Sequence, residues 1–250
     1  MSRLRRVSQR LTNKAADVIS WQVAWRVHDR LGALERDGLD HRTMHALLSV
    51  LLEPDSSLLD VGANEGVFLS AALRFAPSGR HWAWEPLPVM AQSLRERFPS
   101  VEVRGAALGD EPGEADFIHL IDSHGQSGFH ERNLGSDTAR ETIRVKVERL
   151  DDVLDPNLTP AVIKVDVEGA ELGVFRGARE TIARHRPVIM FEHMVDAAEY
   201  FGARSEDLWD LLCADCRLRI YDLNGAGPYS REEFADAVGL RTRWNWLARP

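Results

Sequence analysis

Long apolar runs are missing from this sequence of 250 residues. No segment approaches the roughly 20 apolar residues that cross a membrane as a helix, and the N-terminus lacks the apolar core of a signal peptide. From these absences we expect a cytoplasmic protein. The formal net charge of -8 shows no excess of basic residues, which argues against a nucleic-acid-binding protein.

Cysteine is nearly absent, and Cys213 and Cys216 form a single Cys-x-x-Cys pair. One such pair lacks the second half of a structural zinc site. The pair follows the periodic segment 207–212, so we expect it near a helix C-terminus. A redox pair usually stands at a helix N-terminus, where the dipole lowers a thiol pKa. We therefore interpret both cysteines as packing residues.

Short apolar segments alternate from residue 57 onward with segments whose apolar residues recur at helical spacing. We predict strands at 58–61, 81–85, 101–106, 162–167 and 188–192, and helices at 67–75, 88–98, 171–185 and 207–213. An insertion adds two more strands, at 115–120 and 142–150, and the C-terminal part adds a hairpin of 217–223 with 244–248. This alternation predicts an α/β fold with an open, mostly parallel, Rossmann-like sheet, an antiparallel C-terminal strand and helices on both faces.

The first 55 residues are predicted to form a helical extension ahead of a single domain over residues 56–250. Basic residues alternate with apolar residues over 1–14, and a second apolar series follows. Such a segment can make peripheral contact with an anionic membrane, or it can pack on the core as a solvated helix. A further helix over 41–52 ends before Pro54, which marks the boundary to the first strand.

The most informative segment runs from Leu58 to Gly66, where a buried strand ends in an acidic residue and a glycine-rich turn. Gly62 and Gly66 lack a Cβ, so the backbone can turn tightly and approach a ligand. The dinucleotide fingerprint Gly-x-Gly-x-x-Gly needs its middle glycine where Asn64 stands. Asp60 would repel a pyrophosphate, but it can accept hydrogen bonds from a cationic or hydroxylated ligand. S-adenosylmethionine, which carries an ammonium, a sulfonium and a ribose, therefore suits this turn better than a dinucleotide.

Acidic residues stand at the ends of four of the five strands predicted for the main sheet. In an open α/β sheet the ligand lies outside the carboxyl ends of the strands, so these residues are the first candidates for a site. A single carboxylate there is usually a helix cap or a turn residue, whereas a row along one edge indicates binding. The row consists of Asp60, Glu85, Asp166 with Glu168, and Glu192 with His193.

The residues after the second and third strands suit a nucleoside. Glu85 lies 25 residues after Asp60, where an acidic side chain would accept both ribose hydroxyls. Pro86 fixes a turn that cannot continue the strand ladder. Small residues at the third strand end would let a flat adenine lie against the backbone. We therefore assign eight residues to cofactor binding: Asp60, Gly62, Asn64, Gly66, Glu85, Pro86, Ala106 and Ala107.

The densest motif is the segment Lys-Val-Asp-Val-Glu-Gly-Ala-Glu over residues 164–171. Strand alternation places Lys164, Asp166 and Glu168 on one side, and a buried strand does not tolerate three charges without a partner or a ligand. Glu171 falls in the first turn of the next helix, where its charge is favourable to the helix dipole. An ion pair of Lys164 with the carboxylates, plus a helix cap, is the structural alternative.

Together these motifs resemble the FkbM family of S-adenosylmethionine-dependent methyltransferases over about residues 56–248. Besides the segments already described, the resemblance includes Ala106 to Asp110, Phe191-Glu192-His193 and the ending Trp244 to Ala248. It implies a class I methyltransferase fold and S-adenosyl-L-methionine as the cofactor. It also implies methyl transfer to a hydroxyl of a small-molecule, sugar or glycolipid acceptor.

Transfer to an alcohol at neutral pH needs a base that removes the hydroxyl proton. Asp166 and Glu168 are the first candidates, and Glu192 and His193 the second. A histidine acts near pH 7 without a large pKa shift, although a single histidine after a strand is more often structural. The acids could also hold a divalent cation through oxygen ligands, but no spacing requires a metal and none is assigned.

Two other functions are weighed against methyl transfer: a nucleotide-dependent oxidoreductase on a similar sheet, and a non-catalytic nucleotide-binding module. The missing middle glycine at Asn64 argues against the oxidoreductase. The joint presence of the glycine turn, Glu85 and the segment 164–171 argues against the binding module, because a degenerate site would have lost at least one of them.

Overall fold

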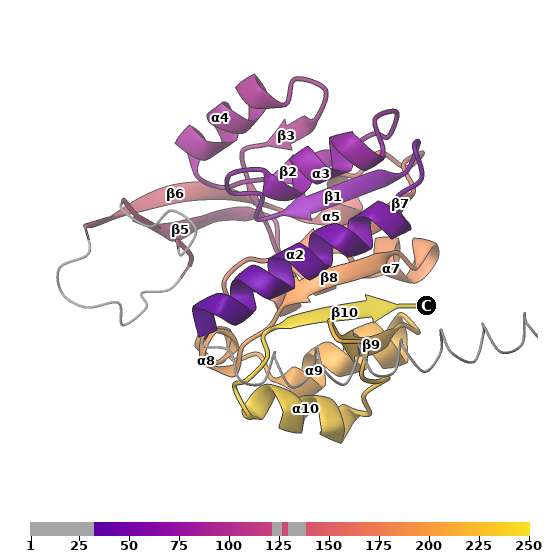
Figure 1. The fold of residues 1–250 in the computed structure, drawn as a ribbon. Coiled ribbons are helices and arrows are strands. Elements are labelled where there is room, and N and C mark those ends of the chain that lie inside the picture. The colour runs from indigo at the N-terminus through magenta and orange to yellow at the C-terminus, as the bar shows by residue number, and fades with distance from the viewer. Residues whose placement is uncertain (1–32, 122–126, 130–138) are drawn as a thin grey trace, which may run out of the picture.

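The computed structural model describes residues 33–121, 127–129 and 139–250 (Figure 1). Within these residues, a seven-stranded sheet has the order β3-β2-β1-β7-β8-β10-β9. Neighbouring strands are parallel except at β10, which runs antiparallel to β8 and β9. The strands are β1 (Ser57–Val61), β2 (Trp82–Trp84), β3 (Glu102–Arg104), β7 (Pro160–Val165), β8 (Val188–Glu192), β9 (Arg219–Asp222) and β10 (Asn245–Arg249). The predicted mostly parallel sheet with a reversed C-terminal strand is confirmed.

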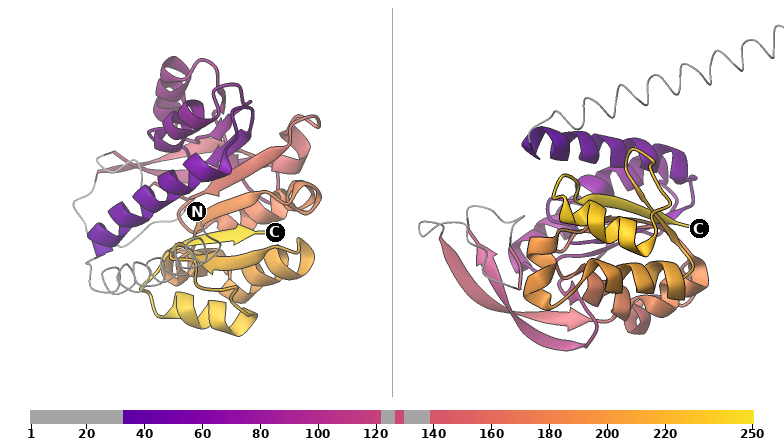
Figure 2. Two further views of the ribbon diagram at one scale, coloured as in Figure 1. Left: turned by 45° about the vertical axis from the view of Figure 1, so that its right-hand side comes forward. Right: turned by 90° about the horizontal axis from the view of Figure 1, so that it is seen from below.

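Helices cover both faces of this sheet, as the alternation predicts (Figure 2). One face packs a core against α2 (Ala33–Leu51), α3 (Val67–Phe75) and α4 (Pro88–Arg97). The other face packs a second core against α5 (Leu150–Val153), α6 (Glu171–Gly177), α7 (Arg179–His185), α9 (Ser205–Trp209) and α10 (Arg231–Gly239). A short α8 (Val195–Ala198) follows β8. Because β1 lies between the two cores, all five of its residues are buried.

A small three-stranded sheet projects beyond the large one (Figure 1). It consists of β4 (Ala107–Leu108), β6 (Arg140–Glu148) and β5 (Gly113–Leu120), in that order. The antiparallel pair β5 and β6 confirms the two strands predicted in the insertion. The predicted strand 101–106 was too long, because the chain leaves the large sheet after Arg104 and pairs with β6 as β4.

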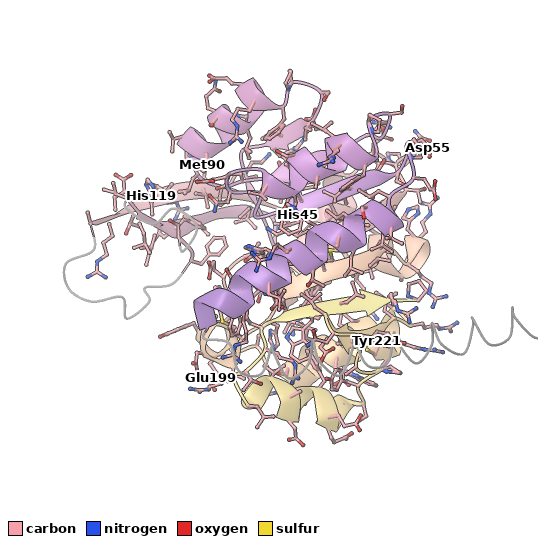
Figure 3. All side chains as sticks on the ribbon, viewed as in Figure 1. His45, Asp55, Met90, His119, Glu199 and Tyr221 are labelled. Carbon is pink, nitrogen blue, oxygen red and sulfur yellow. The ribbon has the colours of Figure 1, made fainter. Side chains whose placement is uncertain are left out.

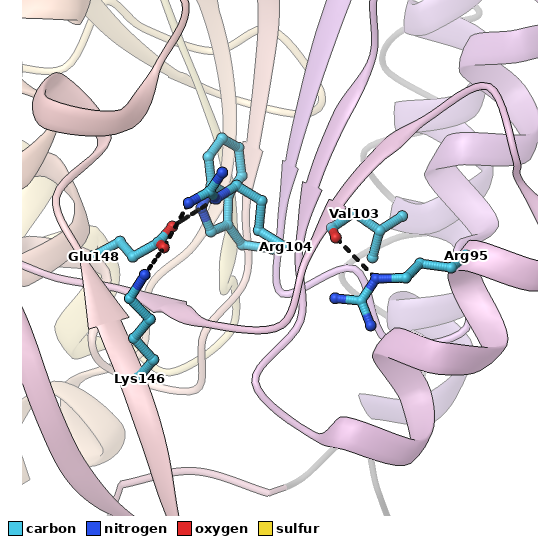
Figure 4. A network of polar contacts seen from close by, with 6 residues as sticks. Arg95, Val103, Arg104, Lys146 and Glu148 are labelled. Atoms are coloured by element: carbon cyan, nitrogen blue, oxygen red, sulfur yellow. Dashed lines mark hydrogen bonds and ion pairs between the residues drawn. The ribbon is translucent and has the colours of Figure 1, made fainter.

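Glu148, at the end of β6, ties the small sheet to the large one (Figure 4). Its carboxylate accepts hydrogen bonds from Arg104 at 2.7 and 2.8 Å and from Lys146 at 2.7 Å, and the Trp84 indole donates to it at 3.3 Å. Burial raises the pKa of Glu148, but the hydrogen bonds from Arg104 and Lys146 outweigh burial and lower this pKa to about 2. The network therefore fixes the position of Trp84 against β6.

The helix predicted over 171–185 is two helices, α6 and α7, which meet at Ala178. The carboxylate of Asp151 accepts hydrogen bonds from the backbone N–H groups of Glu180 and Thr181, both at 2.9 Å. Because this contact from a distant part of the chain satisfies two free N–H groups in the first turn of α7, a new helix can start there.

Helix α2 confirms the helix predicted over 41–52 and begins earlier than expected, at Ala33. The predicted basic amphipathic segment 1–14 lies outside the described residues. Among the helices that are described, none has the length and apolarity needed to cross a bilayer.

Candidate active site

A pocket lies at the carboxyl ends of β1, β2 and β7, where open α/β sheets bind their ligands. Its wall includes the turn after β1, the ends of β2 and β7, and β4. Phe117 of β5, with Ser127 and Phe129, adds a wall from the small sheet, and α2 contributes His41. Seven of the predicted site residues line the pocket: Gly62, Asn64, Glu85, Pro86, Ala107, Asp166 and Glu168. Five do not: Asp60, Gly66, Ala106, Glu192 and His193.

The glycines of the turn are required by packing against neighbouring elements. Gly62 and Gly66 have φ angles of 76° and 74°, in the left-handed region that favours glycine. A Cβ on Gly62 would lie 1.9 Å from the carbonyl oxygen of Asp166, and one on Gly66 would lie 2.5 Å from the Phe98 ring. Asn64 adopts a φ of 45°, which asparagine tolerates better than most residues. The sequence located this turn correctly, but close approach to a ligand is not the only reason for its glycines.

Glu85 joins the turn after β1 to the end of β2. Its Oε2 accepts a hydrogen bond from the Asn64 N–H, and its Oε1 accepts one from the Leu87 N–H, both at 2.9 Å. Burial raises the pKa of Glu85 above its ordinary value, although these hydrogen bonds act in the opposite direction. A carboxylate offers about four acceptor positions, so the two backbone contacts leave room for two hydroxyl groups.

Lys164 and Asp60 form a buried charged pair beneath the pocket. Asp60 is fully buried, and neither of its carboxylate oxygens has a hydrogen-bond partner among the described residues. The Lys164 ammonium lies 3.5 Å from Asp60 and 3.5 Å from Asp166, and it donates to the Gly62 carbonyl at 2.7 Å. The ion pair that the sequence offered as the structural alternative is therefore present.

Burial and the neighbouring charges act in opposite directions on the pKa values of Asp60 and Lys164. Burial raises the pKa of Asp60 to about 6, and the nearby Lys164 charge offsets only part of that rise. Burial lowers the pKa of Lys164, but the carboxylates of Asp166 and Asp60 outweigh it, so this pKa lies above its ordinary value. Lys164 therefore stays charged, and its ammonium links the buried Asp60 to Asp166 at the pocket wall.

The segment 164–171 brings its acids together through a turn. Strand β7 ends at Val165, earlier than predicted, and Glu168 has a φ of 61°. The expectation that strand alternation places Glu168 on the same side as Lys164 and Asp166 was therefore wrong. Glu168 still lines the pocket. Glu171 Oε1 accepts hydrogen bonds from the N–H groups of Val167 at 3.3 Å and Gly169 at 2.9 Å, which hold the turn closed. Burial raises the pKa of Glu171 to about 7.

Asp166, Glu168 and Glu192 converge where β7 and β8 end. One carboxylate oxygen from each lies within 4.8 Å of the others, and all three residues are half-buried. Carboxylates at this separation repel one another when all are ionised, and their oxygens are ligands of the kind that bind a divalent cation. Glu192 lies outside the pocket lining but contributes to this group.

His193 follows Glu192 but is buried away from the pocket. Its Nε2 lies 3.0 Å from the Ser205 hydroxyl, and its ring stacks on Phe234 at 6.0 Å between centroids. Burial lowers the pKa of His193 to about 4. The structure therefore brings the three acids together and does not bring His193 to them.

Sequence reasoning missed the aromatic walls and the contribution of α2. Phe68 lines the pocket from the first turn of α3, and its ring lies 5.4 Å from the Lys164 ammonium. The ring of Phe117, on β5, meets that of Phe129 edge to face at 5.2 Å between centroids. These residues look like ordinary core positions in the sequence, and only the path of the chain brings them to one cavity.

The strand order, the reversed β10 and the pocket at the ends of β1, β2 and β7 define a class I methyltransferase fold. A family model for the methyltransferase FkbM domain matches residues 60–220. This chain belongs to the FkbM methyltransferase family, as the sequence motifs implied.

Several known proteins are similar to this chain. The 31-O-demethyl-FK506 methyltransferase FkbM of Streptomyces tacrolimicus is 31% identical over 182 residues, which cover 60% of this chain and 70% of that protein. The 2-O-methyltransferase NoeI of Sinorhizobium fredii is 28% identical, over 56% of this chain and 64% of that protein. The AMB antimetabolite synthetase AmbE of Pseudomonas aeruginosa is 26% identical, over 80% of this chain. The match covers 12% of AmbE, so this chain spans less than two thirds of both AmbE and NoeI.

A solved structure supports the fold. The crystal structure of methyltransferase FkbM from Methylobacillus flagellatus superimposes with a TM-score of 0.50 at 18% identity. The superposition covers 80% of this chain and 44% of the other. At this level of identity the likeness shows a shared fold.

Proposed function

We propose that this chain transfers a methyl group from S-adenosyl-L-methionine to a hydroxyl oxygen of a small-molecule, sugar or glycolipid acceptor. The observation that carries the proposal is Glu85, whose carboxylate retains two acceptor positions beside the glycine turn. The printed names of two relatives, a 31-O-demethyl-FK506 methyltransferase and a 2-O-methyltransferase, also support transfer to oxygen.

The residues of the pocket fit the parts of this cofactor. Glu85 would accept the two ribose hydroxyls, and the backbone of the turn at Gly62 and Asn64 would bind the amino-acid end. Ala107 and Leu108 are buried small and apolar residues at the pocket wall, suited to a flat adenine. When bound, the cofactor supplies a methyl group that is activated by its positively charged sulfur.

Asp166 is the proposed base that removes the proton of the acceptor hydroxyl. It lines the pocket, and its ion pair with Lys164 holds the carboxylate in place. Glu168 and Glu192 lie beside it, with one carboxylate oxygen of each of the three residues within 4.8 Å of the others. A positioned base of this kind contributes about 10²–10⁴-fold to the rate. We assign no part in this step to His193, because it lies outside the pocket.

Calorimetric titration of the chain with S-adenosylmethionine, with NADH as the control and with magnesium present or absent, tests the cofactor. Transfer of a labelled methyl group to a panel of sugars and polyketides then tests the reaction. Micromolar binding of S-adenosylmethionine alone, followed by transfer, would support the proposal. Binding of NADH instead would favour the oxidoreductase alternative, and cofactor binding without transfer to any acceptor would favour the binding module.

A further inference from the structure

His41 is a pocket residue that lies outside the segment matched by the family model. The model covers residues 60–220, whereas His41 lies on α2 and is exposed at the pocket wall. The neighbouring Arg42 is also exposed but does not line the pocket. The helix ahead of the family domain therefore contributes one specific side chain to the site.

Helix α2 holds His41 in a fixed place because both of its halves are anchored. The Trp244 indole donates to Asp37 at 3.3 Å, and the Asn245 amide donates to Asp40 at 3.2 Å. The second half of the helix packs against α3 and buries Met44 and Leu48. His41 lies between these two anchors and directly follows the buried Asp40.

The strand order places the anchor of α2 on the side of the sheet that carries the proposed base. Asn245 pairs in register with Glu192, so the anchor of α2 lies beside the end of β8 (Figure 1). Glu85 follows β2, which lies across β1 and β7 from β8. The helix that carries His41 is therefore anchored on the side of β7 and β8, where Asp166 lies, and away from Glu85, to which we assign the ribose.

The contacts of His41 agree with this placement. Its ring meets Phe68 edge to face at 6.1 Å, and Phe68 in turn lies 5.4 Å from the Lys164 ammonium beside Asp166. His45 lies one turn further along α2 (Figure 3). Its ring packs on Phe68 at 5.1 Å between centroids, and the residue is half-buried. The two histidines differ in that His41 lines the pocket, whereas His45 does not.

We infer that the His41 imidazole hydrogen-bonds a second hydroxyl of the acceptor, so that α2 helps to select acceptors with several hydroxyl groups. A neutral imidazole both donates and accepts, as a hydroxyl does, whereas the carboxylates here only accept and Lys164 only donates. The hydroxyl that receives the methyl group is left to Asp166. This inference rests on the proposed function and assigns His41 a positioning role.

The test compares His41→Ala and His41→Gln with the matched control Arg42→Ala, which changes an exposed neighbour on the same helix. The probes are the methyl glycosides of glucose, mannose and galactose, with cyclohexanol as an acceptor that has a single hydroxyl. Transfer of labelled methyl gives kcat and KM for each probe. Calorimetry gives the affinity for S-adenosylmethionine and shows that each variant is folded.

We expect His41→Ala to raise the KM for the best glycoside about tenfold, as for the loss of one hydrogen bond, with kcat and cofactor affinity little changed. His41→Gln should restore part of this KM, because an amide also donates and accepts. Arg42→Ala should match the wild type, and the KM for cyclohexanol should not respond to either change at His41.

Five results would overturn the inference. Equal effects of His41→Ala and Arg42→Ala, or equal effects on glycosides and cyclohexanol, would leave the proposed function intact and remove His41 from acceptor recognition. A fall in kcat without a change in KM would make His41 the base, and weaker cofactor binding would place it in the cofactor site. A wild type that methylates cyclohexanol as well as it methylates the glycosides would remove the inference and leave transfer to a hydroxyl intact.

Discussion

Replacement of Lys164 by methionine should destabilise the fold by about 3–5 kcal/mol at pH 8, the cost of removing one partner from a buried ion pair. Asp60 has no exposed surface and no hydrogen-bond partner among the described residues, so the ammonium 3.5 Å away is its main compensation. Lys164 also donates to the Gly62 carbonyl, which would lose this donor.

The loss should depend on pH, because Asp60 can take up a proton. Its pKa in the folded state is raised to about 6 from 3.8, so its stabilising contribution is fully present below about pH 4 and is lost as the pH rises through 6. Without Lys164 the folded-state pKa rises further, at about 1.4 kcal/mol for each unit. The variant should therefore lose less stability at pH 5, where Asp60 folds protonated, than at pH 8.

Urea unfolding followed by tryptophan fluorescence at pH 5 and pH 8 measures both losses. The double variant Asp60→Asn with Lys164→Met removes the charge that was left alone, and it should recover at least half of the loss at pH 8. A loss below about 1 kcal/mol at pH 8, equal losses at the two pH values, or no recovery in the double variant would refute this account of the pair.

Four further predictions concern the pocket and its supports. Glu85→Ala should weaken S-adenosylmethionine binding about 10- to 100-fold, as expected for hydrogen bonds to a charged group, and unchanged affinity in calorimetry would reject the ribose role. Asp166→Asn should lower kcat about 10²–10⁴-fold and spare cofactor binding, and near-normal turnover would move the base elsewhere. Glu148→Gln should cost about 2–3 kcal/mol at pH 7 in urea unfolding. Because the folded-state pKa of Glu148 is lowered to about 2 from 4.5, this cost should shrink as the pH falls from 4.5 towards 2, and a constant cost would contradict it. Burial raises the pKa of Cys213 to about 12 and that of Cys216 to about 11, so a thiol reagent at pH 8 should label them only after unfolding; rapid labelling of the native protein would contradict their packing role.

The sequence predicted the large sheet well, because burial leaves a strong local signal. The run ending at Asp60 and the later apolar strands alternate with helices, and this pattern alone indicates the parallel sheet. The reversed β10 followed from the hairpin with β9. Errors arose where a distant contact decides the structure. The break between α6 and α7 depends on Asp151, and the end of β3 depends on pairing with β6.

The sequence predicted the acidic residues of the candidate site but not the aromatic residues and the histidine that line the rest of the pocket. Strand ends indicated Glu85 and Asp166 correctly as pocket residues, because the carboxyl ends of parallel strands meet at one edge. The position of a residue at a strand end does not show which way its side chain points. Asp60 points towards Lys164 rather than into the pocket, and His193 points into the core. His41 carries no signal in the sequence, because only the docking of α2 brings it to the pocket.

The most direct test of the central claim is a crystal structure of the chain with S-adenosylhomocysteine. The account predicts the ribose hydroxyls within hydrogen-bond distance of Glu85, the amino-acid end at the turn of Gly62 and Asn64, and the sulfur on the side of Asp166. A nucleoside bound elsewhere, or a ribose that makes no contact with Glu85, would contradict it.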